Sequence, residues 1–418
     1  MKKGEGTMEK TKKEISLGTK ILIGIVIGLA VGFLSPTLAE TLSPLGDIFL
    51  RLLKMLMVPL VFFSITAGIC KMGDVKRLAT VGLRYIIFIL IAAGITATIG
   101  ILVAKVIHLG SGTTEFLDEA AQVESVSYNF IDNMVAWIPD NVVDAMATAN
   151  MLQIIVFAIF LGIALLSLGE RANVFIKFMD QGSEIMLKIT EFVMAYSPIG
   201  IASLMATMVT AVSGATMKEV IAFIAADYAC GIVILVILYP LIIKVFAKLS
   251  PLRFMKKISE PIIVAATTTS SAATLPVSIQ TAGEKLGIPE NIYGFTLPLG
   301  NTCGMSGFAL FIGLLCVFAS NLYGLPLSLG DIAQYIFLGI VLSVGAAGVK
   351  GAGVIMSTVL LETIGMPLSL IPILAAIWPA IDPCHTVLNN VGDLIGTTII
   401  SRQLGEMDME VYEGQTKV

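Results

Sequence analysis

The sequence predicts an all-α, polytopic membrane protein, and three observations support this fold class. Of the 418 residues, 56% are hydrophobic and only 13% are charged, a composition that is not typical of soluble domains of this length. Apolar runs in the first part of the chain are long enough to cross a bilayer as helices. The rest of the chain consists of shorter apolar runs, separated by clusters of small or polar residues.

The long apolar runs alternate with connections of different charge. We place these spanning segments at about 18–36, 45–70, 82–107, 151–169, 186–210 and 219–247. Lysines and arginines gather before the first segment and after the second and sixth, whereas the polar insertion at 110–150 is acidic. By the positive-inside tendency, we expect a cytoplasmic N-terminus, an extracellular insertion and a location in the cell (cytoplasmic) membrane.

The second part of the chain carries clusters of small or polar residues at 267–276, 300–307 and 345–353. A small-residue apex followed by a broken helix occurs at 251–323 and again at 331–404, as in transporters built from inverted repeats. A purely structural interpretation is also open, because hydroxyls often bond to their own helix and small residues let helices pack closely. The matching positions in the two halves favour re-entrant hairpin tips.

A polar face interrupts the last apolar stretch. At about 100° per residue, five side chains of a helix here share a wedge of roughly 100°: Asp382, His385, Thr386, Asn389 and Asp393. Pro379 and Pro383 each free a carbonyl one turn earlier, so we expect a kinked backbone. We interpret the face as the floor of a binding site, with a polar helix end near the water interface as the alternative. Asp227, in the sixth segment, is expected to face a cavity or a partner helix.

Metal and cofactor sites are not expected. The five cysteines form no CxxC pair and lie mostly in apolar runs, which indicates buried thiols rather than metal ligands. With only two histidines in the chain, a dedicated histidine-based metal site is not expected either.

Four motifs in the second part of the chain resemble those of a known family, and they occur in that family's order. They are similar to a serine-rich hairpin tip, the opening of a broken seventh helix, a second hairpin tip and the last helix: 270–271 with 273–277, 296–300, 343–349 and 382–393. From its first helix to Arg402, the chain resembles the glutamate transporter or dicarboxylate/amino acid:cation symporter family.

The resemblance implies eight transmembrane helices and two re-entrant helical hairpins per protomer, arranged as inverted repeats in a homotrimer. A transport domain would move like an elevator against a fixed scaffold. The expected parts are an N-terminal tail, scaffold helices 1–2, transport-domain helix 3, an extracellular loop with scaffold helices 4–5, the transport domain and a C-terminal tail: 1–17, 18–70, 79–108, 109–216, 217–404 and 405–418. In the transport domain, helix 6 would be followed by hairpin 1, broken helix 7, hairpin 2 and helix 8: about 251–287, 290–323, 331–364 and 368–404.

Carried over by position, the resemblance gives roles to several residues. Asp382 would hold the ammonium of a substrate, and Thr386 and Asn389 would meet its carboxylate, since hydroxyl and amide donors at a broken helix suit that group. Further substrate contacts would come from Ser270, Ser271, Met305 and Gly351. The tip at 345–353 would be the extracellular gate, because glycines let a hinge change its backbone angles.

The chain departs from the family at one substrate position. Acidic amino acid transporters of the family have an arginine where this chain has His385, and a histidine cannot form the same forked contact with a carboxylate. The family's alternative arginine positions hold Thr269 and Trp378. We therefore expect a neutral polar amino acid, or an acidic one bound with His385 protonated.

A second departure removes ligands for sodium. In the broken helix, 304–308 replaces the family's Asn-Met-Asp-Gly-Thr, and its three side-chain ligands are lost. The ligand positions of the third helix hold residues without a side-chain oxygen: Ile89, Ala92 and Ala93. Hard cations need several oxygens, so we expect one sodium site to be absent, while another keeps only Asn389 and Asp393. A third, built largely of backbone carbonyls, is not decided by side chains.

These observations predict a secondary transporter, not an enzyme, that moves a small amino acid by an elevator mechanism. Coupling to sodium is expected to be lost or reduced, with protons as the substitute. Asp393 is the first candidate for the proton carrier, because desolvation favours a neutral carboxyl, and His385 is the second. Asn389 remains as an ion ligand. Lys350 enters the second hairpin tip, where its ammonium would fill the space of a cation or, alternatively, be solvated.

The alternatives differ in coupling or in class. Among carriers, they are a sodium-coupled symporter of acidic amino acids or dicarboxylates and an uncoupled exchanger. An anion channel and a sensor that binds substrate without transport belong to different classes. The expected partners are a small-molecule substrate, membrane lipids and further copies of the chain, and no nucleic acid is expected.

Overall fold

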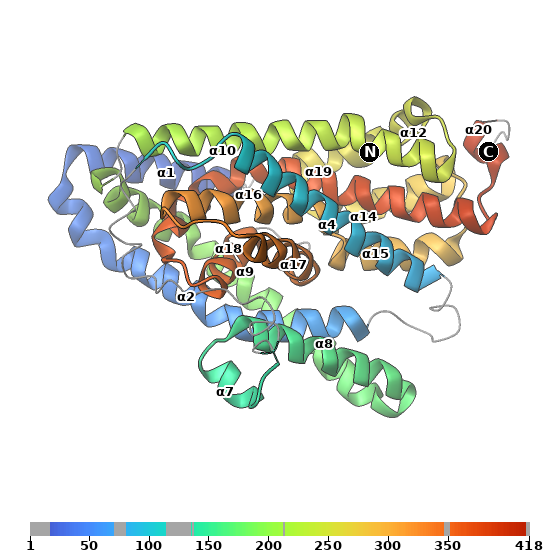
Figure 1. Ribbon diagram of the computed structural model, residues 1–418, viewed down its shortest axis with the longest axis horizontal. Coiled ribbons are helices and arrows are strands. Elements are labelled where there is room, and N and C mark those ends of the chain that lie inside the picture. Colours follow the sequence, from blue (N-terminus) through green and yellow to red (C-terminus); the bar gives the residue numbers. More distant parts are fainter. Residues whose placement is uncertain are drawn as a thin grey trace, which may run out of the picture.

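The computed structural model describes residues 17–70, 81–113, 135, 138–211, 214–346 and 352–414, and all the regular elements within these ranges are helices. Within these ranges, six helical stretches are long and apolar enough to cross a membrane, and three shorter helices are also apolar. Figure 1 shows that many of them run roughly along the long axis of the molecule. The chain is therefore a multi-pass membrane protein, as its composition predicts.

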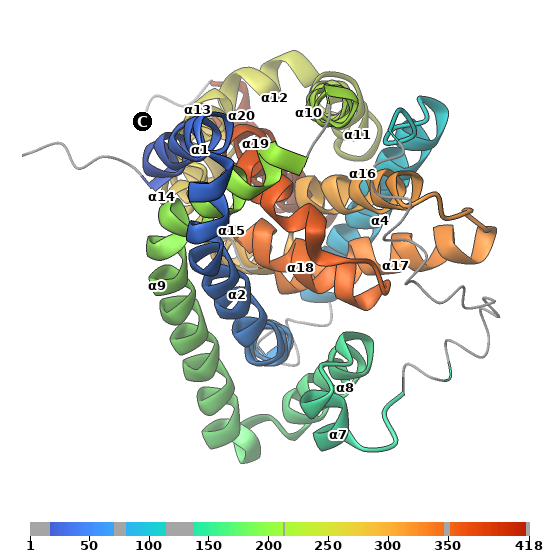
Figure 2. The ribbon, with the colours of Figure 1, turned by 90° about the vertical axis from the view of Figure 1, so that its left-hand side faces the viewer.

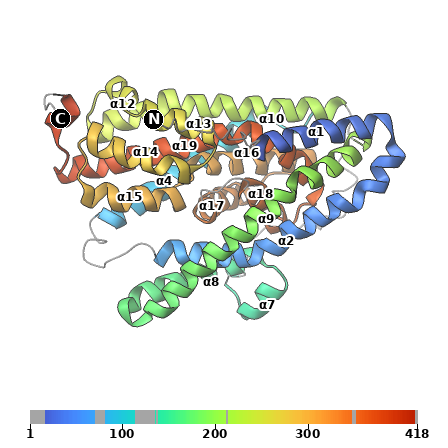
Figure 3. The same ribbon diagram turned by 180° about the vertical axis from the view of Figure 1, so that it is seen from behind.

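One group of helices, which we call the N-terminal group, packs mainly on itself: α1 (Leu17–Leu34), α2 (Pro36–Cys70), α8 (Met151–Leu168) and α9 (Asn173–Ala211). Figures 2 and 3 show α9 crossing α2 on one side of the molecule. Gly24 and Gly28 of α1 lie against the backbone of α9 at Pro198 and Ala202, so these two helices approach closely. The short α7 (Val142–Ala147) precedes α8, and η2 (Gly169–Ala172) links α8 to α9.

Two of these helices begin earlier than the hydropathy indicates. The sequence places the second segment from about residue 45, but α2 begins at Pro36. The Ser35 hydroxyl accepts a hydrogen bond from Leu38 N at 3.4 Å. Proline suits the first helical position because the N–H that it lacks would have no partner within the helix there. The sequence places the fifth segment from about residue 186, but α9 begins at Asn173, because its first turns carry exposed charged residues that lower the average hydropathy there.

The remaining helices form a second group, which we call the C-terminal group. Its first members are α4 (Leu83–Val106), α10 (Gly214–Val233), η3 (Ile234–Leu238), α11 (Tyr239–Ile242), η4 (Ile243–Ala247), α12 (Pro251–Lys257) and α13 (Ser259–Thr268). They are followed by α14 (Ser271–Gln280), η5 (Thr281–Lys285), α15 (Glu290–Cys303), α16 (Ser306–Leu322), α17 (Leu329–Gly345), α18 (Ala352–Thr363), η6 (Leu368–Leu370), α19 (Ile371–Leu404) and α20 (Met409–Glu413). In Figures 1 and 3, α19 runs through this group beside α10.

Two interruptions shape the centre of the C-terminal group. Between α13 and α14 the chain turns at Thr269, which has a left-handed φ of 49°, and Ser270 caps α14 by accepting from Ala273 N at 3.3 Å. Between α15 and α16 the helix is broken at Gly304 and Met305. Backbone of this kind is tolerated inside a membrane protein only where protein or a water-filled cavity surrounds it, and here the break itself and nearly all of α16 are buried.

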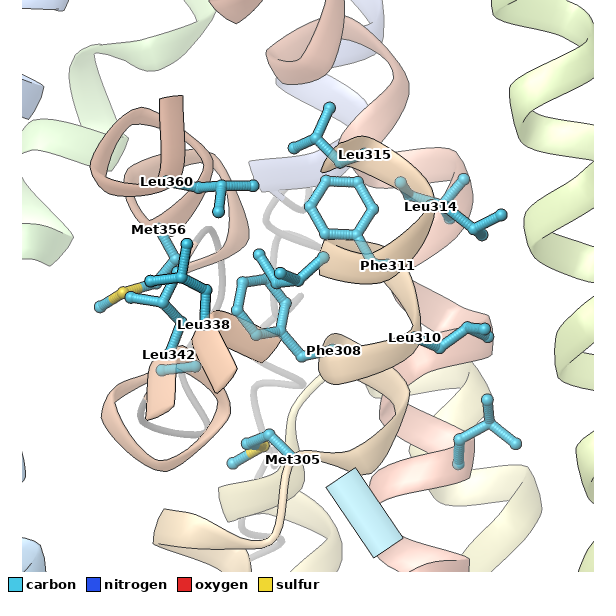
Figure 4. Close-up of a cluster of buried hydrophobic side chains, with 14 of the residues drawn as sticks. Met305, Phe308, Leu310, Phe311, Leu314, Leu315, Leu338, Leu342, Met356 and Leu360 are labelled. Atoms are coloured by element: carbon cyan, nitrogen blue, oxygen red, sulfur yellow. The ribbon is translucent and has the colours of Figure 1, made fainter. Parts of the chain in front are cut away.

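The tip between α17 and α18 falls at 347–351, outside the described residues. The predicted roles of Lys350 and Gly351 therefore lie outside them as well. On either side of this tip, α17 and α18 pack against α16. Figure 4 shows Phe308 and Phe311 of α16 in one apolar cluster with side chains of the two neighbouring helices: Leu338, Leu342, Met356 and Leu360.

Candidate functional site

The polar face predicted from the sequence lies on α19, which runs without interruption from Ile371 to Leu404. The helix continues through both prolines on this stretch, so they do not break it. Four of the five polar side chains are buried, with exposed fractions of 1% to 6%: His385, Thr386, Asn389 and Asp393. Asp382 is half-buried. This burial favours an internal site over the alternative of a helix end near water.

His385 is paired with a carboxylate of a different helix. Its Nε2 lies 2.7 Å from Oδ1 of Asp227 on α10, and the two residues are 1% and 0% exposed. The imidazole ring also packs against Phe311 and Trp378, with ring centroids 5.5 Å away in each case. Asp227 thus faces a partner helix, one of the two surroundings expected for it. The imidazole is engaged by a carboxylate within the protein.

Two tyrosines of the sixth segment add further contacts to α19. The hydroxyl of Tyr228 donates to the carbonyl of Ala380 at 2.5 Å, and that of Tyr239 donates to the carbonyl of Leu388 at 3.0 Å. Together with the pair of Asp227 and His385, they connect α10 and α11 to α19 at three positions along α19. Two of these contacts, those of His385 and Tyr239, are buried, and breaking a buried hydrogen bond leaves a polar group unsatisfied, so they fix the relative position of the helices.

Asn389 connects α19 to the break between α15 and α16. Its side-chain oxygen accepts from Gly307 N at 2.7 Å, and its Nδ2 lies 3.1 Å from the sulfur of Met305. The first N–H groups of a helix have no partner within it, so Asn389 satisfies one of those at the start of α16. The structure therefore brings together Asn389 and Met305, two of the predicted substrate contacts.

The turn between α13 and α14 also rests on α19. Asn390 donates through Nδ2 to Ser271 Oγ at 3.1 Å and to the carbonyl of Thr386 at 2.8 Å. The structural interpretation of the hydroxyl-rich run holds in part, because Thr267 and Thr268 bond to carbonyls of their own helix. Asn390 was not identified from the sequence, although it stands beside Asn389 in an apolar stretch.

Asp393 is buried against the end of α15. Tyr85 of α4 donates its hydroxyl to Oδ1 at 3.0 Å, and the same oxygen lies against Gly300 and Gly304, where a Cβ would overlap it. The C-terminal end of a helix carries partial negative charge from its unpaired carbonyls. A charged carboxylate at this place is therefore unfavourable unless a cation or a proton accompanies it.

The positions expected to have lost sodium ligands are filled by apolar groups. Ile89 and Ala93 are buried, and Phe308 packs in the cluster of Figure 4, with its ring centroid 6.1 Å from that of Trp378. Ser306 is the one hydroxyl that remains in the altered motif. Its Oγ lies 2.8 Å from the hydroxyl of Tyr239, and its carbonyl accepts from Thr96 at 2.7 Å.

Besides Asn390, four residues with contacts in this region are not predicted from the sequence: Tyr85, Thr96, Tyr228 and Tyr239. Each is a hydroxyl in an apolar helix, which is a detectable signal, but the helix opposite to it is not visible in the sequence. The described residues hold no group of three or more histidine, cysteine, aspartate or glutamate side chains that would suit a metal ion.

Substituting Gly300 by alanine is expected to destabilise the protein, because its Cβ would overlap both the Tyr85 hydroxyl and Asp393 Oδ1. Overpacking of this kind costs about 1–3 kcal/mol. Gly294→Ala is a matched control in the same helix, since the nearest atom to its Cβ is 3.8 Å away, and alanine is a better helix former by about 0.5–1 kcal/mol. Thermal unfolding in detergent should show a lower midpoint for Gly300→Ala only. Equal midpoints for the two variants would contradict the packing described.

Comparison with known proteins assigns the chain to a family. Residues 17–403 match the sodium:dicarboxylate symporter family. The chain is 28% identical over 409 residues to a proton/sodium-glutamate symport protein of Bacillus caldotenax. The match covers 95% of this chain and 97% of that protein. The chain is 29% identical over 401 residues to a C4-dicarboxylate transport protein of Anaeromyxobacter sp. (strain K), with 94% and 91% covered. A C4-dicarboxylate transport protein of Bacillus subtilis (strain 168) is 27% identical over 414 residues, with 96% and 98% covered. The chain therefore belongs to the sodium:dicarboxylate symporter family and is a secondary transporter.

Proposed function

We propose that this transporter carries a small amino acid without an acidic side chain, and that protons rather than sodium drive it. The observation that carries the substrate proposal is the buried contact between His385 and Asp227. A second carboxylate on the substrate would need a cationic partner, and His385 is already engaged by a carboxylate of the protein. A protonated His385 would have its charge balanced by Asp227, so it would offer little attraction to an anionic side chain.

The remaining polar groups suit the two charges of an amino acid backbone. Asp382 is half-buried on α19, and we assign it to the substrate ammonium. Thr386 lies one turn further, with its hydroxyl 3.5 Å from Asp382 Oδ1, and we assign it to the carboxylate together with hydroxyl or backbone donors of Ser270 and Ser271. Asn389 and Met305 contact each other in the protein, so in this proposal they shape the site from the side of α16.

The proposal of sodium independence rests on what fills the altered positions. Ile89 and Ala93 are buried side chains without an oxygen, and Phe308 lies in an apolar cluster. Asp393, which would share a cation in a sodium-coupled carrier, instead accepts a hydrogen bond from Tyr85. A proton on Asp393 would remove the unfavourable charge at the end of α15, which makes this residue our first candidate for coupling.

The division into two helix groups supports an elevator mechanism in which the C-terminal group moves against the N-terminal group. In this proposal α1, α2, α8 and α9 form the scaffold, and three copies of the chain associate. In this proposal the pair α13 and α14 and the pair α17 and α18 are the two re-entrant hairpins, and the second pair acts as the gate by moving away from α19. The N-terminus lies in the cytoplasm.

A second candidate function is a sodium-coupled symporter of acidic substrates. It is favoured by the relatives, which are named for the transport of glutamate with protons and sodium and for the transport of C4-dicarboxylates. In that case a second carboxylate would have to be met by neutral donors at this site.

Counterflow in liposomes tests the proposal. Purified protein is reconstituted into vesicles loaded with one unlabelled solute, and uptake of the same labelled solute is followed for each amino acid and small dicarboxylate, with and without sodium. We expect saturable counterflow for a neutral amino acid in the absence of sodium. Counterflow of glutamate or a dicarboxylate that requires sodium would instead establish the second candidate. A channel would show no counterflow, and a sensor would move no solute.

A further inference from the structure

A basic hollow lies where the C-terminal segment returns to the C-terminal group. Its volume is about 410 Å³, and its lining comes from α12, η5 and α20: Arg253, Lys256, Lys257, Lys285, Tyr412 and Glu413. Four of these six side chains carry a positive charge and one carries a negative charge. The hollow therefore has an excess of positive charge, and nothing in the transport site described above uses it.

Most of the positive charge has no anionic partner within the described part of the chain. Lys285 forms an ion pair with Glu260 at 2.7 Å, in which both side chains are considerably exposed. Such exposed pairs are weak, so they leave much of the field of the lysine in place. In the residues the structure describes, no carboxylate forms an ion pair with Arg253, Lys256 or Lys257.

Lys257 forms the inner wall of the hollow. Its Nζ donates to the carbonyl of Lys285 at 2.8 Å and lies 5.3 Å from the centre of the Tyr412 ring. Burial lowers the pKa of Lys257, and the neighbouring charges of Arg253 and Lys285 lower it further. Burial also raises the pKa of Tyr412, so this ring stays neutral and brings no negative charge. An anion in the hollow would relieve the repulsion among the three cations.

The hollow is built by specific contacts of the C-terminal segment. Asp408 N donates to the carbonyl of Gly287 at 2.7 Å, and the Asp408 carboxylate caps α20 by accepting from Glu410 N and Val411 N. The Tyr412 side chain that follows is buried. These contacts place α20 opposite α12 and fix the width of the opening.

The position of the hollow relative to the membrane indicates which anion it takes. Pro251, the first residue of α12, follows closely after η4, the end of a membrane-spanning segment. Leu252, next to Arg253, has an exposed fraction of 85%, and Val245 and Phe246 at the end of the span are exposed as well. Cations beside exposed apolar side chains at the end of a span match the boundary between lipid headgroups and acyl chains.

We propose that this hollow binds the phosphate of an anionic phospholipid headgroup, with Arg253, Lys256 and Lys257 as its charged contacts. The exposed Leu252 would lie beside the acyl chains of the same lipid. Inorganic phosphate shares the chemistry of the headgroup but lacks those chains, and thus would bind more weakly.

The test is equilibrium binding of a fluorescent phosphatidylglycerol to the full-length protein in neutral detergent at about 0.15 M salt, where long-range charge effects are screened. The variant is Arg253→Gln with Lys256→Gln, because both side chains are exposed and neither makes a hydrogen bond or ion pair within the described residues. The control is Lys105→Gln with Lys218→Gln, which removes the same charge from two exposed positions outside the hollow. Lys105 lies at the end of α4, and Lys218 lies near the start of α10. Unlabelled phosphatidylcholine and inorganic phosphate serve as competitors.

Phosphatidylglycerol should bind the wild type and the control alike, and bind the variant that lacks the charges of Arg253 and Lys256 about 25-fold more weakly, since each basic residue near a lipid surface contributes roughly a factor of five. Neither phosphatidylcholine nor millimolar phosphate should displace it. Equal affinity of the variant would show that the lipid does not use this hollow. If inorganic phosphate displaced the labelled lipid at a concentration equal to that of the lipid, the acyl chains would add nothing to binding. The hollow would then be a site for soluble phosphate and not for a lipid.

Discussion

Asp382→Asn is expected to weaken binding of the transported amino acid at least a hundredfold. In the proposed site the Asp382 carboxylate meets the substrate ammonium, and removing one partner of a desolvated charge pair costs about 3–5 kcal/mol. Asparagine keeps the shape of the side chain and an oxygen near Thr386, so the change is mainly one of charge. Isothermal titration of the purified protein with its transported amino acid measures the effect.

Asp47→Asn is the matched control, because Asp47 is an exposed carboxylate on α2 in the N-terminal group. It should bind substrate as the wild type does. If Asp382→Asn also binds nearly normally, the ammonium does not lie at Asp382. A dicarboxylate without an amino group would then become the better candidate for the substrate.

Asp393→Asn is expected to abolish most of the uptake that an inward pH gradient drives, while substrate binding at equilibrium changes little. Asparagine mimics the protonated carboxyl, so the variant still binds but has no proton to release. We expect driven uptake to fall at least about tenfold, in line with typical coupling free energies of 1–3 kcal/mol. Proteoliposomes with and without a pH gradient, and with and without sodium, provide the measurement.

Tyr85→Phe is a useful companion variant, because it removes the hydrogen bond to Asp393 and keeps the carboxyl group itself. It should retain coupling to protons, unlike Asp393→Asn. Substrate affinity should be nearly independent of sodium in the wild type and in both variants. A steep, saturable dependence of wild-type binding on sodium would contradict the proposal and would require a sodium site made largely of backbone carbonyls.

The elements were more predictable than the contacts between them. Hydropathy located the apolar segments, because a span needs a long run of apolar residues. The cluster at 300–307 coincides with the break at Gly304 and Met305, since small residues without stabilising side-chain packing weaken a helix locally. The start of α2 at Pro36 depends on one capping residue, a signal that an average over many residues hides.

The contacts of the site were largely beyond reach of the sequence. Helical periodicity shows that His385 and Asp393 share a face, but it does not show which helix lies opposite that face. Asp227 and Tyr85, their partners, are 158 and 308 residues away in the chain. From the sequence, a histidine in place of an arginine predicts only a weakened substrate contact. Its pairing with Asp227 depends on the position of α10, which only the folded structure gives.

Trp378 lies between parts of the protein that are proposed to separate. Its indole packs against Gly353 of α18, where a Cβ would overlap the ring, and against Phe311 and His385 on other sides. The chain has only one other tryptophan, Trp137. Indole emission shifts to longer wavelength when water reaches the ring. Withdrawal of α18 from α19 would therefore move the emission maximum of Trp378 to longer wavelength. The protein thus contains an intrinsic optical probe, and Trp137→Phe would make it the sole source of the signal.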